Sequence, residues 1–415
     1  MKKKLLIING AGASVEFGMP SVKEIDKLFS QWSNDYCKLV NDANENLYDW
    51  VKAKTNEHFI SNKITNNIDN FENHLYTMAL IESALTNSNH WLYFSNKLKP
   101  FIDKFIELPK IDYFNRNIEI VNDHHFSFLQ SYLIDNLLSH FRRLCIDLEN
   151  SFTDEQLLLK KFYKDLQREF DIGIYNLNYD NVIIRNVDNL KTGFSEINNQ
   201  LDRNLLHSDD WNFCYHIHGS VHFDMKGGTD NTQMHKINWN GDLKSLFSQN
   251  SSGRSSQYTS EGIIIKTSSI IAGLGKTNQL LREPFMQYYM TLDKNINEAD
   301  AILFLGYGFS DLHFNALFEF IRFNQIKNRK VVVVDYANKD TESFQFRQDS
   351  WSNGVQQALP FNHYELEKRH IFDINEFRLK KDFERNSNAK HHIAIWYNGF
   401  IEACKNSNKI IQELS

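Results

Sequence analysis

Residues 5–21 read LLIINGAGASVEFGMPS, and this stretch constrains the possible fold more than any other. A short apolar run ends in a glycine-containing turn, and the residues after the turn have the pattern of a helix. Gly10 and Gly12 allow the backbone to turn tightly and to approach a ligand closely. Ser21, with Glu24 three residues later, has the capping-box pattern of a helix start. A strand, a glycine turn and a helix predict an α/β fold that begins with a phosphate-binding loop.

The spacing of this loop differs from the common dinucleotide fingerprint. Val15 stands where G-x-G-x-x-G requires its third glycine, and a tight turn without a ligand is the alternative interpretation. A second stretch, IAGLGKT (271–277), ends like an ATP-binding P-loop. Ile270 occupies the position of the first glycine of that motif, so we do not expect this chain to hydrolyse ATP.

Short β-branched runs alternate with helical patterns in the second half of the chain. This alternation is typical of parallel strands that are buried on both faces. We therefore predict a Rossmann-like parallel sheet with helices on both faces. The predicted strands are residues 171–178, 212–219, 262–266, 301–308 and 330–336.

The sequence predicts two regions. Residues 1–338 form the first, and residues 30–170 within it carry apolar residues at helical spacing, which indicates a large helical insertion. A polar stretch rich in glycine and serine, residues 224–262, predicts a loop. Residues 339–415 show no clear strand and close with a helical pattern. We expect this C-terminal helical extension to pack on the same domain or to make an oligomer contact.

Composition and charge exclude several classes of protein. The net charge of −6 and the pI near 6.2 argue against a general nucleic-acid binder. None of the four cysteines has C-x-x-C spacing, which argues against a disulfide framework and a cysteine-based zinc site. The apolar run at the start is shorter than the roughly 7–15 residues of a signal peptide core. No run approaches the roughly 20 apolar residues of a membrane span, so we expect a cytoplasmic protein without a membrane partner.

Polar residues follow one of the predicted strands directly. Asn176, Asn178 and Asp180 lie in YNLNYDN, at the carboxyl end of the strand over 171–178. Open parallel sheets bind ligands at this edge, so these side chains are candidate site residues. An Asx-rich turn without a ligand is the alternative.

Three histidines occur in CYHIHGSVHF (214–223). His216 and His218 share one face of the predicted strand, and one of them could serve as a general base. A metal site built from His216, His218 and His222 is a second interpretation, although no companion carboxylate has suitable spacing. The third interpretation is that all three histidines are buried and hydrogen-bonded and have only a structural role.

A second glycine loop occurs in FLGYGFSDLHFN (304–315). Ser310 and Asp311 are alternative caps of the helix that follows, and the loop is a further candidate for nucleotide contact. VVVVDYAN then ends the next strand with Asp335, whose carboxylate is suitably placed to accept ribose hydroxyls.

These four segments, in this order, resemble the sirtuin-like (Sir2-like) NAD-binding family. GAGASVEFGMP resembles the family register G-A-G-x-S-x-x-x-G-[IM]-P, and LNYD resembles Q-N-I-D. IHG resembles L-H-G, and FLGYGFSD resembles the later G-T-S-type loop, in its form G-Y-S-x-x-D. The resemblance implies contacts to NAD+ from Gly10, Ala11, Gly12, Ala13, Ser14, Gly18, Pro20, Tyr179, Gly306, Tyr307, Ser310, Asp311 and Asp335.

The chain also departs from the deacylating sirtuins. It lacks their zinc-binding cysteine pairs, and Ser21, Val22 and Lys23 replace the D-F-R that follows G-I-P. It is therefore more similar to the zinc-less NAD hydrolases of bacterial antiviral defence. That resemblance implies NAD+ as the substrate, no metal, and cleavage of the nicotinamide–ribose bond through an oxocarbenium-like state.

The resemblance also assigns roles to individual residues. Asn178 would hold the ribose hydroxyls or the attacking water, and His218 would act as the general base. Asp180 would hold the nicotinamide or ribose side. The N–H groups of Gly12–Ser14 would cradle the pyrophosphate, while Gly306, Ser310 and Asp335 would face the adenosine half. The carboxylate of Asp335 would repel a 2′-phosphate and thus favours NAD over NADP.

Two other functions remain open at this point: a deacylase or ADP-ribosyltransferase on the same fold, and a module that senses NAD or ADP-ribose without turnover. An enzyme that depletes NAD must be controlled, and the resemblance suggests control by assembly. We expect a homo-oligomer, joined to a HerA-like hexameric ATPase or, alternatively, to an Argonaute-type protein. Residues 30–170 would make oligomer contacts or gate the pocket; plain core packing is the alternative.

Overall fold

The chain divides into two compact units. We call them the sheet unit (Met1–Met19, Leu144–Ser220 and Met286–Ser415) and the insertion unit (Pro20–Arg143 and Val221–Phe285). The domain bounds predicted from the sequence stay a prediction. The computed structural model describes residues 2–40, 45–61, 70–85, 107–113, 117–226, 236–251, 257–258, 264–265, 267–272, 280, 282–323, 329–337, 351, 354–359, 379–386 and 392–415.

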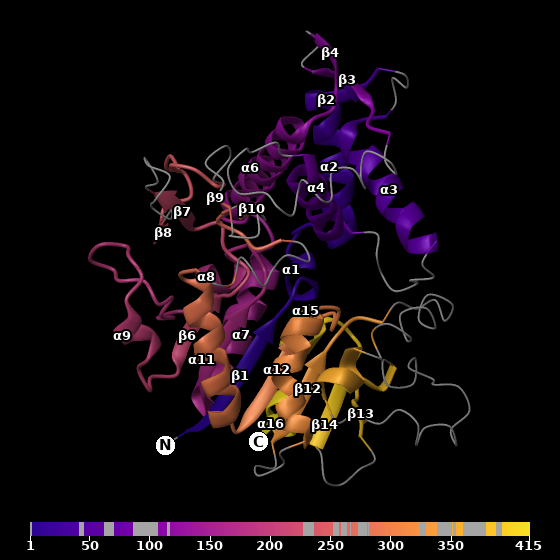
Figure 1. Ribbon diagram of the computed structural model, residues 1–415. Coiled ribbons are helices and arrows are strands. Elements are labelled where there is room, and N and C mark those ends of the chain that lie inside the picture. The colour runs from indigo at the N-terminus through magenta and orange to yellow at the C-terminus, as the bar shows by residue number, and fades with distance from the viewer. Residues whose placement is uncertain are drawn as a thin grey trace. The chain divides into compact units, whose positions relative to one another are not determined.

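The described part of the sheet unit contains one seven-stranded sheet, in the order β13-β14-β12-β11-β1-β5-β6 (Figure 1). Neighbouring strands run parallel except for β13, which pairs antiparallel with β14. This sheet confirms the predicted Rossmann-like α/β fold class. The strands are β1 (Lys3–Asn9), β5 (Phe170–Asn176), β6 (Asn212–His216), β11 (Ala301–Leu305), β12 (Lys330–Val334), β13 (Glu384–Arg385) and β14 (His392–Trp396).

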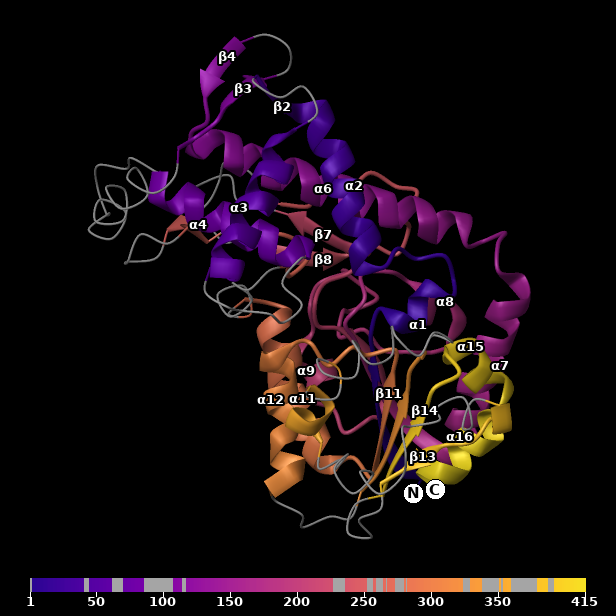
Figure 2. The same ribbon diagram turned by 90° about the vertical axis from the view of Figure 1, so that its right-hand side faces the viewer.

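Helices cover both faces of this sheet, as Figure 2 shows. In the central strand β1, Leu5, Leu6, Ile7 and Ile8 are all apolar and fully buried, as expected for a strand covered on both faces. One face is covered by α7 (Thr153–Glu169), α15 (Phe400–Lys405) and α16 (Ser407–Leu414), and the other by α11 (Phe285–Glu298) and α12 (Leu312–Phe323). The unit also contains the short helices α1 (Gly12–Val15), α8 (Val182–Asn186) and α9 (Arg203–Leu206).

The order of the strands creates a switch point beside β1. The chain runs from β1 to β5 and β6 on one side, and then returns to β11 on the other side of β1. Leu5 pairs with Ala301 and Asn9 with Leu305, so the two strands end together. In open α/β sheets, ligands bind at such a point, outside the carboxyl ends of the strands. The loops after β1 and β11 therefore flank the expected binding position.

Two expectations about strands are wrong. The run over 262–266 does not join the large sheet: within it, β10 (Ile264–Ile265) pairs antiparallel with β9 (Gln257–Tyr258) in the insertion unit. The segment after residue 340, in contrast, supplies two strands of the large sheet, and β14 pairs with β12. Periodicity cannot separate a short buried strand from a buried helix segment, which explains the second error. The first arose because a strand pattern does not determine which sheet the strand joins.

The insertion unit contains α2 (Val22–Tyr36), α3 (Leu47–Ser61), α4 (Phe71–Leu85) and most of α6 (Asp123–Asp147). These helices overlap residues 30–170, and the assignment of that stretch as one helical insertion stays a prediction. The sequence did not predict the antiparallel sheet of β2 (Cys37–Leu39), β3 (Lys110–Tyr113) and β4 (Asn117–Ile120). The expected loop over 224–262 contains a hairpin of β7 (Phe223–Lys226) and β8 (Lys236–Trp239), and parts of the stretch lie outside the described residues.

The start of α2 has the predicted capping box. Glu24 N donates to Ser21 Oγ at 3.3 Å, and Ser21 N donates to the Glu24 carboxylate at 2.7 Å. Hydrogen bonds from the backbone and side chain of Ser21 lower the pKa of Glu24. The two residues thus satisfy each other's backbone donors at the first turn.

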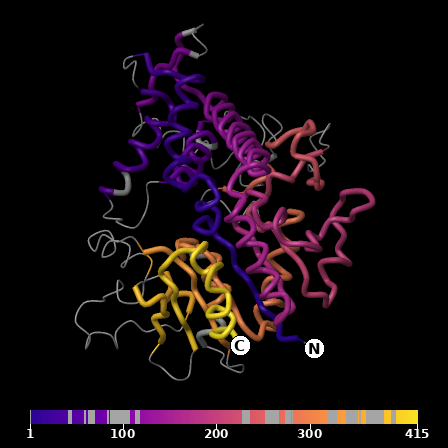
Figure 3. Tube along the Cα trace, turned by 180° about the vertical axis from the view of Figure 1, so that it is seen from behind, coloured from indigo at the N-terminus to yellow at the C-terminus, as the bar shows by residue number. Residues whose placement is uncertain are grey.

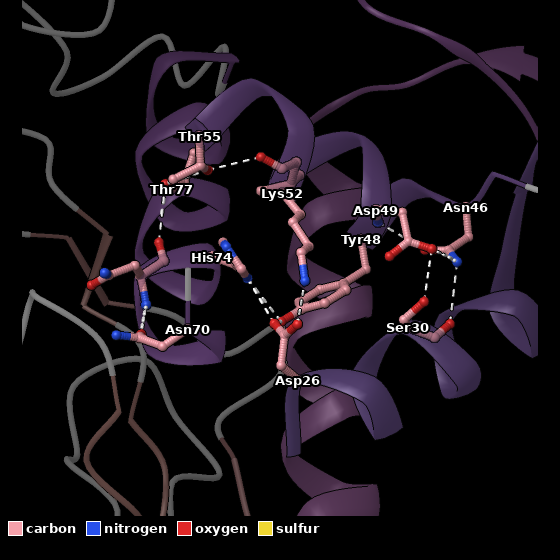
Figure 4. A network of polar contacts seen from close by, with 12 residues as sticks. Asp26, Ser30, Asn46, Tyr48, Asp49, Lys52, Thr55, Asn70, His74 and Thr77 are labelled. Atoms are coloured by element: carbon pink, nitrogen blue, oxygen red, sulfur yellow. Dashed lines mark hydrogen bonds and ion pairs between the residues drawn. The ribbon is translucent and has the colours of Figure 1, made fainter. Parts of the chain in front are cut away.

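A buried charge network joins α2, α3 and α4 (Figure 4). Asp26 on α2 accepts a hydrogen bond of 2.6 Å from Tyr48 Oη, lies 3.0 Å from His74 Nδ1, and pairs with Lys52. Burial alone would raise the pKa of Asp26, but hydrogen bonds from His74, Lys52 and Tyr48 together lower it. The ionised carboxylate is therefore the centre of contacts between three helices.

Segments far apart in the chain meet in the sheet unit. Lys3 Nζ donates to the Ser415 carbonyl oxygen at 2.6 Å, and Figure 3 shows the two ends near each other. Glu16, after the first strand, accepts from the backbone N–H groups of Phe400 and Ile401 at 2.6 and 3.0 Å. Within the described residues, no helix has both the length and the apolar character needed to cross a membrane.

Candidate functional site

Three polar residues form a row where β1, β5 and β6 end. Asn9 pairs with Asn176, and Asn176 pairs with His216, in the register of the parallel strands. Asn9 Nδ2 donates to Asn176 Oδ1 at 2.9 Å, and both side chains are fully buried. Asn9 was not among the predicted site residues. A polar residue that closes an apolar run directly before Gly10 was the available signal.

Asn178, two residues beyond this row, ties the loop after β5 to the glycine loop. Its Nδ2 donates to the Gly10 carbonyl oxygen at 2.9 Å and to Ser14 Oγ at 2.8 Å. Its backbone N–H donates to Asn176 Oδ1 at 3.1 Å. Both amide hydrogens are thus used within the protein, so the amide oxygen is the group of Asn178 that can accept from a ligand.

Asp180 belongs to the same buried network. Its Oδ1 accepts from Val182 N at 3.0 Å. Burial raises the pKa of Asp180, while hydrogen bonds from Val182 N, from the Ser14 side chain and from its own backbone N–H act in the opposite direction. All of these described partners are neutral, which distinguishes this carboxyl group from one held in an ion pair.

The loops after β1 and β11 touch backbone to backbone. Gly10 N donates to Leu305 O at 2.8 Å, and Gly12 N donates to Gly306 O at 2.9 Å. A Cβ added to Gly12 would lie 2.9 Å from the Cα of Gly306, which itself has a φ of 58°. Only glycine fits so close an approach without strain, so these positions are explained by the contact between the two loops.

The pyrophosphate cradle expected from Gly12–Ser14 stays a prediction, and the N–H groups of this turn have partners within the protein. The N–H groups of Gly12, Ala13 and Ser14 donate to the carbonyl oxygens of Gly306, Gly10 and Ala11, at 2.9, 3.0 and 3.0 Å. The tight turn into α1 is closed by these bonds, and α1 is only four residues long. The three donors are therefore engaged within the protein rather than presented to an anion.

The glycine at position 18, in the second turn of GAGASVEFGMP, is also explained by the structure. Gly18 has a φ of 78°, and a Cβ there would lie 2.9 Å from the Phe152 ring. Pro20, which follows, is half-buried in the insertion unit. Contacts of Ala11, Ala13, Gly18 and Pro20 with NAD+ stay predictions.

His218 lies two residues beyond β6 and meets two residues from later in the chain. Its Nε2 is 3.7 Å from Asp311 Oδ2 and 3.4 Å from Tyr289 Oη. Asp311 is also the cap of α12, because its Oδ1 accepts from Phe314 N at 3.2 Å. Of the two alternative caps, Asp311 is therefore the one used. Tyr289 on α11 was not predicted, since one aromatic residue on a helix face gives no functional signal.

The other two histidines have structural partners. His216 Nδ1 lies 3.3 Å from the carbonyl oxygen of Asn178. His222 belongs to the insertion unit, where it stacks on the Trp239 ring and where burial lowers its pKa to about 4. Among the described residues, no group of three or more His, Cys, Asp or Glu side chains is placed to hold a metal ion. The three-histidine metal site thus finds no support in these positions.

The remaining predicted residues occupy varied surroundings. Tyr307 is buried, and its hydroxyl donates to Asn315 Oδ1 at 2.7 Å, so it supports the start of α12. Asp335 Oδ1 accepts from the N–H of its neighbour Tyr336 at 2.8 Å. Ser310 is exposed and Tyr179 is buried. The structure thus joins Asn178, Asp180, Ser14 and the glycines in one network and places His218 with Asp311 in a second.

One protein-family model matches the part of the chain that carries the site residues after β5, β6 and β11. Residues 173–353 match the model of the SIR2-like domain. The match covers Asn178, His218 and Asp335, but it does not include the glycine loop after β1. It supports a Sir2-like family and points to NAD-related chemistry. The search of curated proteins found no match.

Solved structures that resemble the chain include several sirtuins. Two ADP-ribose complexes of a Sir2 homologue, each of a different point mutant, are 9% identical to this chain, with TM-scores of 0.29 and 0.31. They are covered over 95% and 93% of their length, and this chain over 87% and 86%. A Sir2 protein bound to a propionylated peptide is 10% identical, with a TM-score of 0.30 and coverage of 89% of this chain and 95% of that one. Scores this low carry no argument about function.

Proposed function

We propose that this protein is an NAD glycohydrolase, which cleaves NAD+ to ADP-ribose and nicotinamide. One observation carries the proposal: Asn178 and His218 lie within the stretch matched by the SIR2-like domain, and both follow strand ends at the carboxyl edge of the sheet. That edge is where open α/β sheets bind nucleotides. The function is depletion of cellular NAD in bacterial defence against phage.

The orientation of Asn178 supports its proposed role. Its two amide hydrogens are held by Gly10 and Ser14, which leaves its oxygen as an acceptor of fixed position. A ribose hydroxyl and a water molecule are both donors that fit such an acceptor. Asn178 therefore orients the ribose or the attacking water, and Ser14 connects it to Asp180.

The reaction needs one base and one water. The bond between nicotinamide and C1′ of the ribose breaks, and nicotinamide leaves with the bonding electron pair as a neutral amide. The oxygen of water forms the new bond to C1′. His218 takes the proton from that water, or from a ribose hydroxyl, and the histidine then returns it to solvent. The products are ADP-ribose, nicotinamide and one proton.

Control by assembly is part of the proposal. A chain that destroys NAD+ must be inactive until it is needed, so we expect a homo-oligomer that joins a HerA-like hexameric ATPase, with an Argonaute-type protein as the alternative. Measurement of the native mass of the chain, alone and with the partner, tests this point. A monomer under both conditions contradicts it.

The activity is tested by incubating the purified chain with NAD+, alone and with its partner, and separating ADP-ribose and nicotinamide by chromatography. We expect His218→Gln to reduce the rate by about 100-fold or more, the usual contribution of a general base. His207→Gln is the matched control, because His207 is exposed in the same unit. Intact NAD+ under all conditions, or equal rates in His218→Gln and wild type, overturns the proposal. An acylated peptide consumed together with NAD+ favours a deacylase instead.

A further inference from the structure

The cap of α12 and the histidine after β6 meet in the sheet unit. Asp311 Oδ1 accepts from Phe314 N at 3.2 Å, and Asp311 Oδ2 lies 3.7 Å from His218 Nε2. Both side chains are largely buried, at 11% and 7% exposure. The two carboxylate oxygens thus have different neighbours: one completes the helix cap and the other faces the imidazole.

Capping alone does not require a carboxylate at this position. Asn and Ser cap helices about as well as Asp. A carboxylate adds a negative charge, and the N-terminal end of α12 stabilises that charge through the helix dipole. The choice of Asp therefore places a persistent negative charge beside Nε2 of a buried histidine, where little water screens the interaction.

The backbone of Asp311 is also held in place. Tyr307 Oη contacts the Asp311 carbonyl oxygen at 3.4 Å and donates to Asn315 Oδ1 at 2.7 Å, while Asn315 Nδ2 donates to Phe309 O at 2.9 Å. The cap residue is thereby fixed from both sides of the loop. Tyr307, which the family resemblance made a cofactor contact, has this supporting role in the structure.

We infer that Asp311 is the positioning residue of His218: its carboxylate stabilises the imidazolium that forms when His218 accepts a proton. This inference rests on the proposed function for its catalytic meaning. At 3.7 Å the two atoms are too far apart for a direct hydrogen bond, so the interaction is electrostatic. The proton stays on His218 and is not passed to Asp311.

Two other titratable side chains lie near the imidazole. Tyr289 Oη, from α11, lies 3.4 Å from the same Nε2. His216, two residues earlier on β6, directs its Nδ1 to the Asn178 carbonyl oxygen. Asp311 places a carboxylate oxygen 3.7 Å from His218 Nε2, so removal of that charge should make the protonated ring less stable.

The first test measures the charge effect without any catalysis. Histidine-labelled full-length protein is titrated by NMR, and the His218 ring signal is assigned from its loss in His218→Gln. Since the carboxylate favours the protonated ring, Asp311→Asn should move the His218 midpoint to lower pH by about one unit or more. Asn retains the cap. Asp202→Asn, at the cap of α9, is the matched control and should move nothing. An unchanged midpoint in Asp311→Asn overturns the inference.

The second test links the pair to the reaction. In kcat/KM for NAD+ against pH, the acid limb should move to lower pH in Asp311→Asn, because a less basic His218 loses its proton at lower pH. The plateau should fall by about 10-fold or more. If wild type leaves NAD+ intact while the NMR midpoint still moves, the proposed function fails and the pairing stands. If wild type is active but neither quantity moves, the pairing fails and the proposed function stands.

Discussion

Gly306 is the residue through which the loop after β11 contacts the loop after β1. Its φ of 58° is rare for any other residue, and a Cβ there would lie 2.1 Å from the Ala13 backbone nitrogen. The atoms that this Cβ would meet belong to the backbone of Ala13 and Gly12, so a rotamer change cannot relieve the clash. The requirement for glycine is therefore set by the backbone alone.

We predict that Gly306→Ala lowers the free energy of unfolding by about 2–5 kcal/mol, from the left-handed backbone and the steric clash together. The midpoint of urea-induced unfolding measures the loss. Gly308→Ala is the control in the same loop, because a Cβ at Gly308 meets no atom within 4 Å. Equal midpoints for Gly306→Ala and Gly308→Ala contradict the prediction.

Sequence reasoning reached part of this site for a clear physical reason. Polar residues that directly follow buried parallel strands must gather at one edge, so the contact between Asn178 and the glycine loop follows from the strand order. Tyr289 could not be found in this way, because its contact with His218 depends on how α11 packs on the sheet. The hydrogen bonds that occupy the Gly12–Ser14 donors also depend on the turn geometry, which spacing does not determine.

At the scale of elements, three helices of the insertion unit, α2, α3 and α4, share one ionised group. Asp26 on α2 contacts Tyr48 and Lys52 on α3 and His74 on α4 (Figure 4). A carboxylate in this position connects helices that apolar packing alone could allow to shift. The sequence did not indicate the network, since an Asp, a Tyr, a Lys and a His on three amphipathic helices carry no common motif.

We predict that Asp26→Asn lowers the free energy of unfolding by about 3 kcal/mol at neutral pH, the lower end for a broken buried pair, because Lys52 retains access to water. Thermal melting followed by circular dichroism measures it. Asp35→Asn, at an exposed position of the same helix, is the control. A melting temperature equal to that of Asp35→Asn contradicts this prediction.

The same network gives a pH dependence with a definite sign. The pKa of Asp26 is lowered in the folded chain, so its stabilisation is fully present above the unfolded value of about 4. It is lost as the pH falls from there toward the folded pKa. The stability difference between wild type and Asp26→Asn should therefore shrink below about pH 4. A difference that stays constant from about pH 7 to about pH 3 is incompatible with this account.

Over the whole molecule, the end of the chain is part of the central sheet. Strand β14 pairs with β12, and its Trp396 side chain is fully buried against Phe383, with its Nε1 donating to Gly399 O at 3.2 Å. The sequence suggested an appended helical extension, because HIAIW fits a buried strand and a buried helix equally well. The parallel order of the other strands, in contrast, was predictable from their alternation with helices.

We predict that Trp396→Ala lowers the free energy of unfolding by about 3–5 kcal/mol, the usual cost of emptying a buried tryptophan site. Leu379→Ala is the control, since Leu379 lies in the same C-terminal segment and is 85% exposed. Guanidinium-induced unfolding compares the two variants. If both lose the same small amount, β14 is not required by the sheet.

The position of β1 between β5 and β11 also has a consequence for synthesis. Strand β1 ends at Asn9, and its partner β11 begins at Ala301. At the usual ribosomal rates the second strand emerges about 15–60 s after the first. Gly306 cannot meet Gly12 until then, so a growing chain spends most of its time on the ribosome without the loop contact of the mature fold.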